Sequence, residues 1–283
     1  MKKFRTYFVL AILILSASES YPQDTDIDLL EEANNLQRNK EYVRALNLFD
    51  SVLSCYKGGK AYPYALYGKA ETLENLKNKD LSVVYYKDFL HRYYKVREIY
   101  NTIFGYGAYN SAYISAIKIA EYNYENGNYD EALKYYIFAD TANLYTSTCG
   151  SSYMSEKFVL SLFKARCFNK LGMDKEAMDI VEKYILPGVF SQEKGIIDFA
   201  IEVTNKNYGH QSITSEIERS VENIYVVTNK NRSDKKRFAL YFLGNEIFIW
   251  DVNKKKTYEV ESLDKAKEIA RNTKYFKYYL SPK

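Results

Sequence analysis

Few side chains in this 283-residue sequence could form a metal site or a nucleophilic pair. It contains two histidines, His91 and His210, and three cysteines, Cys55, Cys149 and Cys167. A zinc site needs clustered Cys and His ligands at short spacing, and the sequence has no such cluster. A nucleophilic pair of Cys149 or Cys167 with His210 stays open. The simpler interpretation is a surface histidine together with buried free thiols.

Two other patterns resemble catalytic motifs only in part. The stretch Gly105-Tyr106-Gly107 lacks the preceding strand and the following Gly-Lys-Ser/Thr of a phosphate-binding loop. Acidic pairs such as Glu31 with Glu32, or Glu71 with Glu74, lie in amphipathic segments. A solvated face or a binding groove explains them more simply than glycosidase chemistry. We therefore expect no enzyme, no metal ion and no cofactor.

The apolar residues recur at helical spacing through about residue 220. Residues 28–39 and 42–53 form two predicted helices with a short polar break between them. Similar breaks follow later in the chain, for example at residues 125–128. The predicted unit is therefore a helix, a tight turn and a second helix, and it occurs several times.

The clearest copy of this unit includes residues 126–136. Gly127 suits the positive φ that often ends a helix, and Ala132 is small enough for a close helix crossing. The stretch resembles the turn and second-helix start of a tetratricopeptide (TPR) repeat. Related stretches predict four units that start near Asp26, Pro63, Tyr113 and Phe158. These starts are spaced unevenly, against about 34 residues in the family, and Ser82 stands where alanine is expected.

The resemblance covers about residues 26–187 and implies an α-solenoid whose first helices line a concave groove. Transferred position by position, the groove would present Asn34, Gln37, Arg38, Tyr67, Glu71, Glu74, Glu121, Tyr124, Arg166 and Lys170. Aromatic residues interleaved with both charge signs suit a protein or peptide partner. The resemblance thus implies a non-catalytic scaffold.

The repeat register is lost after residues 187–188, and the pattern then changes. The sequence predicts helices at 191–203 and 213–223, strands at 225–228, 238–243, 246–250 and 257–260, and a last helix with Ser262 as its N-cap. Gly244-Asn245 is the predicted turn of a hairpin. We predict a mostly α protein with a helical domain at 21–223 and a small α+β appendage at 224–283. A fragment 21–228 should then keep its fold, unless the hairpin caps the solenoid.

The first 20 residues have the layout of a secretory signal peptide. Lys2, Lys3 and Arg5 precede an apolar run at 8–15 and a small-residue stretch at 16–20. The apolar run is shorter than the roughly 20 residues that span a bilayer, so a retained anchor is the weaker alternative. We expect cleavage between Ser18 and Tyr21, and export to the periplasm or the extracellular space.

The formal net charge of +4 does not indicate a dedicated nucleic-acid binder. The charge is uneven, because residues 229–283 contain fourteen Lys or Arg and seven Asp or Glu. This basic end leaves two alternatives to the scaffold. It could bind an anionic envelope polymer or lipid headgroups, or the appendage could carry an enzymatic or toxin-like activity.

Overall fold

The computed structural model describes residues 25–95, 111–142, 150–186, 194–228, 236–251 and 259–281. The chain divides into two compact units, residues 1–105 and 106–283. The predicted signal peptide, the stretch 105–107, Cys149, residues 229–235 at the start of the basic end and the first half of the predicted strand 257–260 lie outside the described residues.

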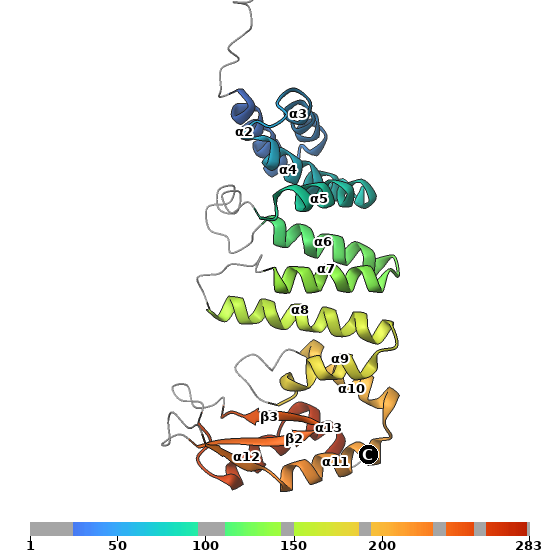
Figure 1. Cartoon of the computed structure of the whole chain (residues 1–283), viewed down its shortest axis with the longest axis vertical. Coiled ribbons are helices and arrows are strands. Elements are labelled where there is room, and N and C mark those ends of the chain that lie inside the picture. Colours follow the sequence, from blue (N-terminus) through green and yellow to red (C-terminus); the bar gives the residue numbers. More distant parts are fainter. Residues whose placement is uncertain are drawn as a thin grey trace, which may run out of the picture. The chain divides into compact units, whose positions relative to one another are not determined.

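The first unit contains two helical hairpins (Figure 1). Its helices are α2 (Thr25–Arg38), α3 (Tyr42–Cys55), α4 (Tyr62–Asn75) and α5 (Lys79–Tyr93). Helix α2 packs on α3, α4 packs on α5, and α3 also packs on α4.

The second unit begins with two further hairpins and ends in a mixed segment (Figure 1). The hairpins consist of α6 (Ser111–Glu125), α7 (Tyr129–Thr141), α8 (Gly150–Lys170) and α9 (Asp174–Val181). The short 3-10 helix η2 (Glu182–Tyr184) and the helices α10 (Lys194–Asn207) and α11 (His210–Glu222) follow. The remaining elements are β1 (Tyr225–Thr228), β2 (Lys236–Phe242), β3 (Asn245–Ile249), α12 (Leu263–Arg271) and α13 (Lys274–Leu280).

One backbone turn joins the two helices of all four hairpins. Its left-handed residue is Lys40, Lys77, Gly127 or Gly172, with φ between 63° and 77°. In each turn the N–H of that residue donates to the carbonyl three residues earlier, and the next N–H donates to the carbonyl five residues earlier. This is the Schellman motif, which satisfies carbonyls at the end of a helix. The left-handed residues have the same uneven spacing as the four predicted unit starts, so the predicted register is confirmed.

Small buried residues lie where the two helices of each hairpin cross. Ala33, Ala45, Ala120, Ala132, Ala165 and Ala177 are all fully buried. In the second hairpin the Ser82 hydroxyl donates to the Ala70 carbonyl at 2.8 Å. The serine therefore fits the alanine position because its hydroxyl finds an acceptor on the facing helix.

Ala132→Leu is expected to destabilise the protein by about 1–3 kcal/mol, because the larger side chain overpacks the crossing of α6 and α7. Glu131→Gln, one residue earlier, is the matched control. The Glu131 side chain is 43% exposed and pairs with Lys134, so its loss should cost less than about 0.5 kcal/mol. Urea unfolding of both variants checks the expectation, and equal losses would contradict the register.

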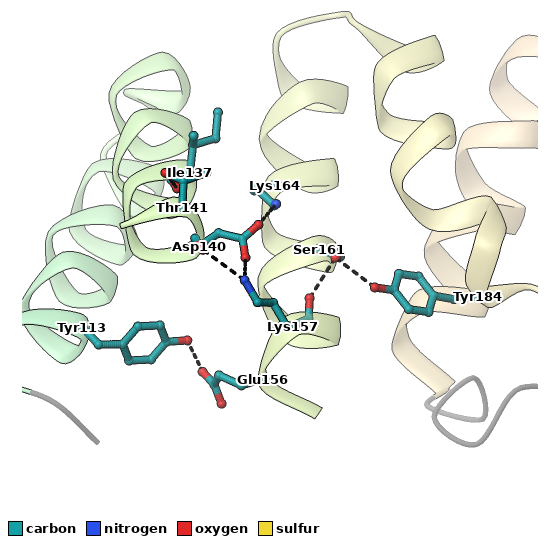
Figure 2. A network of polar contacts seen from close by, with 9 residues as sticks. All are labelled: Tyr113, Ile137, Asp140, Thr141, Glu156, Lys157, Ser161, Lys164 and Tyr184. Atoms are coloured by element: carbon teal, nitrogen blue, oxygen red, sulfur yellow. Dashed lines mark hydrogen bonds and ion pairs between the residues drawn. The ribbon is translucent and has the colours of Figure 1, made fainter. Parts of the chain in front are cut away.

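Polar contacts connect α8 to its neighbours on both sides (Figure 2). Asp140 of α7 accepts hydrogen bonds from Lys157 and from Lys164, the latter at 2.5 Å. Burial opposes ionisation of Asp140, yet these two lysines hold its pKa below the usual value. The Ser161 and Tyr184 hydroxyls share a hydrogen bond of 3.2 Å. These contacts fix α8 between α7 and the segment after α9.

The three strands form an antiparallel sheet in the order β1-β2-β3. The hairpin turn lies one residue earlier than predicted, because Phe242 pairs with Asn245 and the two turn residues are Leu243 and Gly244. Their φ values are 49° and 96°, as a two-residue turn with positive φ at both positions requires. The sequence predicted Gly244-Asn245 as the two turn residues, because leucine rarely adopts the positive φ that Leu243 has here.

The other C-terminal predictions fit the structure within a few residues. Helix α10 ends four residues later than predicted and α11 begins three residues earlier. The Ser262 hydroxyl accepts the Lys265 N–H at 3.1 Å, so it is the N-cap of α12. The described residues of the predicted strand 257–260 lie outside the sheet.

The predicted small α+β segment after residue 223 packs on the preceding helices of the second unit and shares a core with them. Phe238, Leu240 and Phe242 of β2 belong to one hydrophobic cluster with buried residues of α8, α9, α10, α11 and α13. In that cluster the hydroxyls of Thr204 and Tyr275 share a hydrogen bond of 2.6 Å. The sheet and last helices therefore cover apolar side chains of α8, α9, α10 and α11 in the second unit. Among the described helices, none has both the length and the apolar character needed to cross a membrane.

Candidate binding surface

In the first unit, the first helices of two successive hairpins meet at predicted groove positions. The Gln37 side chain of α2 donates to the Glu71 carboxylate of α4 at 2.8 Å. Asn34 is half-buried on α2, and exposed Arg38 donates to Asn35 at 3.1 Å. The structure thus brings Gln37 and Glu71 together, with Asn34 and Arg38 on the same helix as Gln37.

Tyr67 is a core residue, which corrects its predicted place in the groove. Its side chain is 3% exposed, and its ring contacts Tyr86 and Phe89 edge-on at centroid distances of 5.8 and 5.5 Å. Burial raises the pKa of Tyr67, and the nearby acids Glu71 and Glu74 add to the rise. The reason for this burial is that both α3 and α5 pack on α4.

Glu74 has a structural partner within its own hairpin. Its carboxylate accepts the hydroxyl of buried Tyr86 at 3.0 Å. Burial raises the pKa of Tyr86, and the acids around it add to the effect. Glu74 therefore satisfies a core hydroxyl, whereas half-buried Glu71 remains beside Gln37.

In the second unit, Tyr124 of α6 lies within electrostatic range of one side chain of α8 and one of α10. Tyr124 of α6 is half-buried and lies edge-on to Tyr129 at 5.2 Å. Burial raises the pKa of Tyr124, the positive charge of Arg166 opposes the rise, and Glu202 adds to it. Tyr124 and Arg166, predicted from the sequence, thus lie within electrostatic range together with a residue that was not predicted.

Arg166 differs from most described arginines in its partners. Arg44, Arg92, Arg219 and Arg271 each pair with a carboxylate. Arg166 is half-buried and, across the described segments, forms neither an ion pair nor a hydrogen bond. Lys170 is exposed at the end of the same helix, and Glu121 is 3.4 Å from Lys118 on α6. Within the described segments Arg166 thus has no ion-pair partner, and unlike exposed Lys170 it is half-buried.

Glu202 was missed because α10 lies beyond the point where the repeat register is lost. Helix α10 nevertheless packs on α9 and contacts α8, as the first helix of a further hairpin would. Helix α11 then packs on β2 and α13 instead of completing that hairpin. Only the helical periodicity of the sequence indicated α10, and nothing in the motif pattern assigned its residues to the surface.

The histidines and described cysteines are poor candidates for catalysis. Cys167 is fully buried, and burial raises the pKa of its thiol to about 12, so it stays protonated and unreactive at neutral pH. Cys55 is exposed, which corrects the expectation of a buried thiol. His91 is exposed, and His210 packs against Tyr279 at 5.1 Å. Within the described ranges, His, Cys, Asp and Glu form no group of three or more that could hold a metal ion.

No protein-family model and no curated protein matches the chain. Among solved structures, a MamA double mutant has a TM-score of 0.47 at 10% identity, over 67% of this chain and 88% of that one. A putative kinesin light chain from Podosopora anserina with TPR-like repeats has a TM-score of 0.44 at 15% identity, over 71% and 95%. A thermophilic TPR protein of Thermus thermophilus has a TM-score of 0.33 at 15% identity, over 70% and 90%.

The repeat region is TPR-like. The four Schellman turns and the small residues at the helix crossings carry this fold.

Proposed function

We propose that the chain is an exported scaffold that binds an extended segment of a partner protein along the first helices of the hairpins in its second unit. The observation that carries the proposal is half-buried Arg166, which has no carboxylate partner in the described part of the chain and lies within electrostatic range of Tyr124. A partly desolvated guanidinium gains most from a carboxylate in bidentate geometry. The bound segment should therefore carry an acidic side chain or its own C-terminal carboxylate, next to an apolar residue that packs on Tyr124.

Binding fits these residues better than catalysis does. Glu71 and Glu74 are engaged by Gln37 and Tyr86, so neither is placed as a free acid and base pair. The Cys167 thiol is buried with a raised pKa. The groups that could do chemistry thus stabilise the hairpins, while Arg166 remains available to a partner.

Export is the second part of the proposal and is supported by the basic, apolar and small-residue order of residues 1–20. Protein recovered outside the cytoplasm should begin at Glu19 or Tyr21 when its N-terminus is sequenced. An intact Met1 on soluble cytoplasmic protein would contradict export.

The alternative of an anionic polymer or lipid surface at the basic end has less support. Lys267 and Arg271 both pair with Glu222, and Lys265 pairs with Glu268. Charges that are already paired within the chain attract an outside polyanion less strongly. Retention on anionic vesicles that weakens with added salt would favour this alternative.

A pull-down from the extracytoplasmic fraction with the mature protein tests the scaffold. The wild-type protein should capture a partner that Arg166→Ala fails to capture while keeping a near-native melting temperature. Arg219→Ala is the matched control, because Arg219 is an exposed arginine paired with Glu216 on its own helix. Equal capture by the wild-type protein and both variants would place the binding surface away from α8.

A further inference from the structure

A buried acid lies where the end of α9 meets the tip of the β-hairpin. Glu182 is 3% exposed, and its Oε2 atom is buried with no hydrogen-bond partner in the described structure. Asp179 precedes it by three residues and is exposed. Asn245, the first residue of β3, approaches Asp179 with 3.4 Å between Nδ2 and Oδ1. Both Asp179 and Asn245 also act on the charge of Glu182, so three oxygen-bearing side chains converge there.

The charge of Glu182 is poorly compensated by the protein. Burial raises the pKa of Glu182 to about 7, a hydrogen bond from Asn245 opposes the rise, and the negative charge of Asp179 adds to it. A buried carboxylate beside a second acid is unfavourable unless a proton or a cation neutralises it. Asp179 is exposed and Asn245 is half-buried, so solvent reaches this side of the cluster.

We propose that Asp179, Glu182 and Asn245 form a binding site for a divalent cation, and that Ca²⁺ fits it best. Carboxylate and amide oxygens are hard ligands, and Ca²⁺ accepts six to eight of them in flexible geometry, water included. Mg²⁺ fits less well because it demands near-ideal octahedral geometry. Asn245 would present Oδ1 after its amide group turns over, a change that leaves the side chain in place.

The bound ion would connect two segments that are 66 positions apart in the sequence. It would hold the hairpin tip at Leu243 and Gly244 against the end of α9, and it would neutralise Glu182. The ion would therefore stabilise the cover that the sheet and last helices place over the helical hairpins. The sequence did not indicate this site, because its ligands do not cluster along the chain.

Thermal melting of the full mature protein tests the site. At about pH 8, the protein is melted in EDTA, in about 10 mM CaCl2, or in NaCl of matched ionic strength. We expect Ca²⁺ to raise the melting temperature of the wild-type protein by about 2–4 °C over NaCl. Asp179→Asn should lose at least half of this rise, whereas Glu176→Gln, an exposed acid on the same helix, should keep it.

Glu182→Gln separates an ion site from a protonated buried acid. On our account it melts higher than the wild-type protein in EDTA and no longer responds to Ca²⁺. If Ca²⁺ does not raise the melting temperature of the wild-type protein, the site is refuted. If Glu182→Gln also melts higher in that case, Glu182 is simply a buried neutral acid. An undiminished response in Asp179→Asn would also refute it. Should Glu182→Gln fail to fold, the wild-type protein is titrated with CaCl2 in a calorimeter. A binding isotherm that saturates supports the site, and an isotherm that does not saturate overturns the proposal.

Discussion

A fragment that ends at residue 228 is expected to lose the fold of its C-terminal half. Residues 229–283 supply eleven of the 27 buried residues in the cluster shared by the later helices and the sheet, including Phe242, Tyr275 and Phe276. Burying one large apolar side chain contributes about 1.5–3 kcal/mol. The summed loss therefore exceeds the roughly 5–15 kcal/mol that stabilises a typical domain.

Circular dichroism and calorimetry of fragment 21–228 measure this effect. In calorimetry, the unfolding transition of the second unit should disappear. The helical circular dichroism should fall, because only α2 to α5 of the first unit keep their helical structure. A fragment that ends at Ser281, directly after α13, is the control and should melt like the full mature chain. If fragment 21–228 keeps the complete helical signal and a full cooperative melt, the shared core does not stabilise these helices.

Tyr67→Ala is expected to destabilise the first unit by about 3–5 kcal/mol, as truncation of a buried aromatic residue does. The cause is the loss of ring contacts with Tyr86 and Phe89. Tyr67→Phe keeps the ring and should change stability by less than about 1 kcal/mol. Urea unfolding of both variants provides the measurement.

The stability loss of Tyr67→Ala is compared with that of Tyr124→Ala, because Tyr124 is half-buried on the candidate surface. Its stability loss should be less than half of that of Tyr67→Ala. A small loss for Tyr67→Ala would return this ring to the groove, as the sequence predicted.

The four hairpins could be predicted because their turns and crossings leave local signals. Gly127 and Gly172 supply positive φ directly, and Ala132 and Ala177 mark the crossings. Lys40 also has positive φ, yet lysine gives no turn signal, so the first hairpin was recognised from the residues of its helices. The turn of the β-hairpin was misplaced by one residue for the same reason, since Leu243 is not a residue expected there.

The surface residues were harder to predict, because exposure depends on neighbouring elements. Tyr67 and Tyr124 both lie on first helices, but α3 and α5 both cover α4, so only Tyr124 remains half-exposed. Glu202 belongs to a helix outside the repeat register. The packing of 224–283 on the helices could not be predicted either, because a strand pattern shows which face is apolar and not which partner covers it.

The affinity of the purified partner for Arg166→Ala, compared with the wild-type protein and Arg219→Ala, tests the central claim most directly. Isothermal titration calorimetry should show binding weakened by about 2 kcal/mol, roughly 30-fold, for Arg166→Ala. Arg219→Ala should bind like the wild-type protein, and all three proteins should melt within a few degrees of one another. Unchanged affinity for Arg166→Ala, with the fold intact, would contradict a binding surface on the first helices of the second unit.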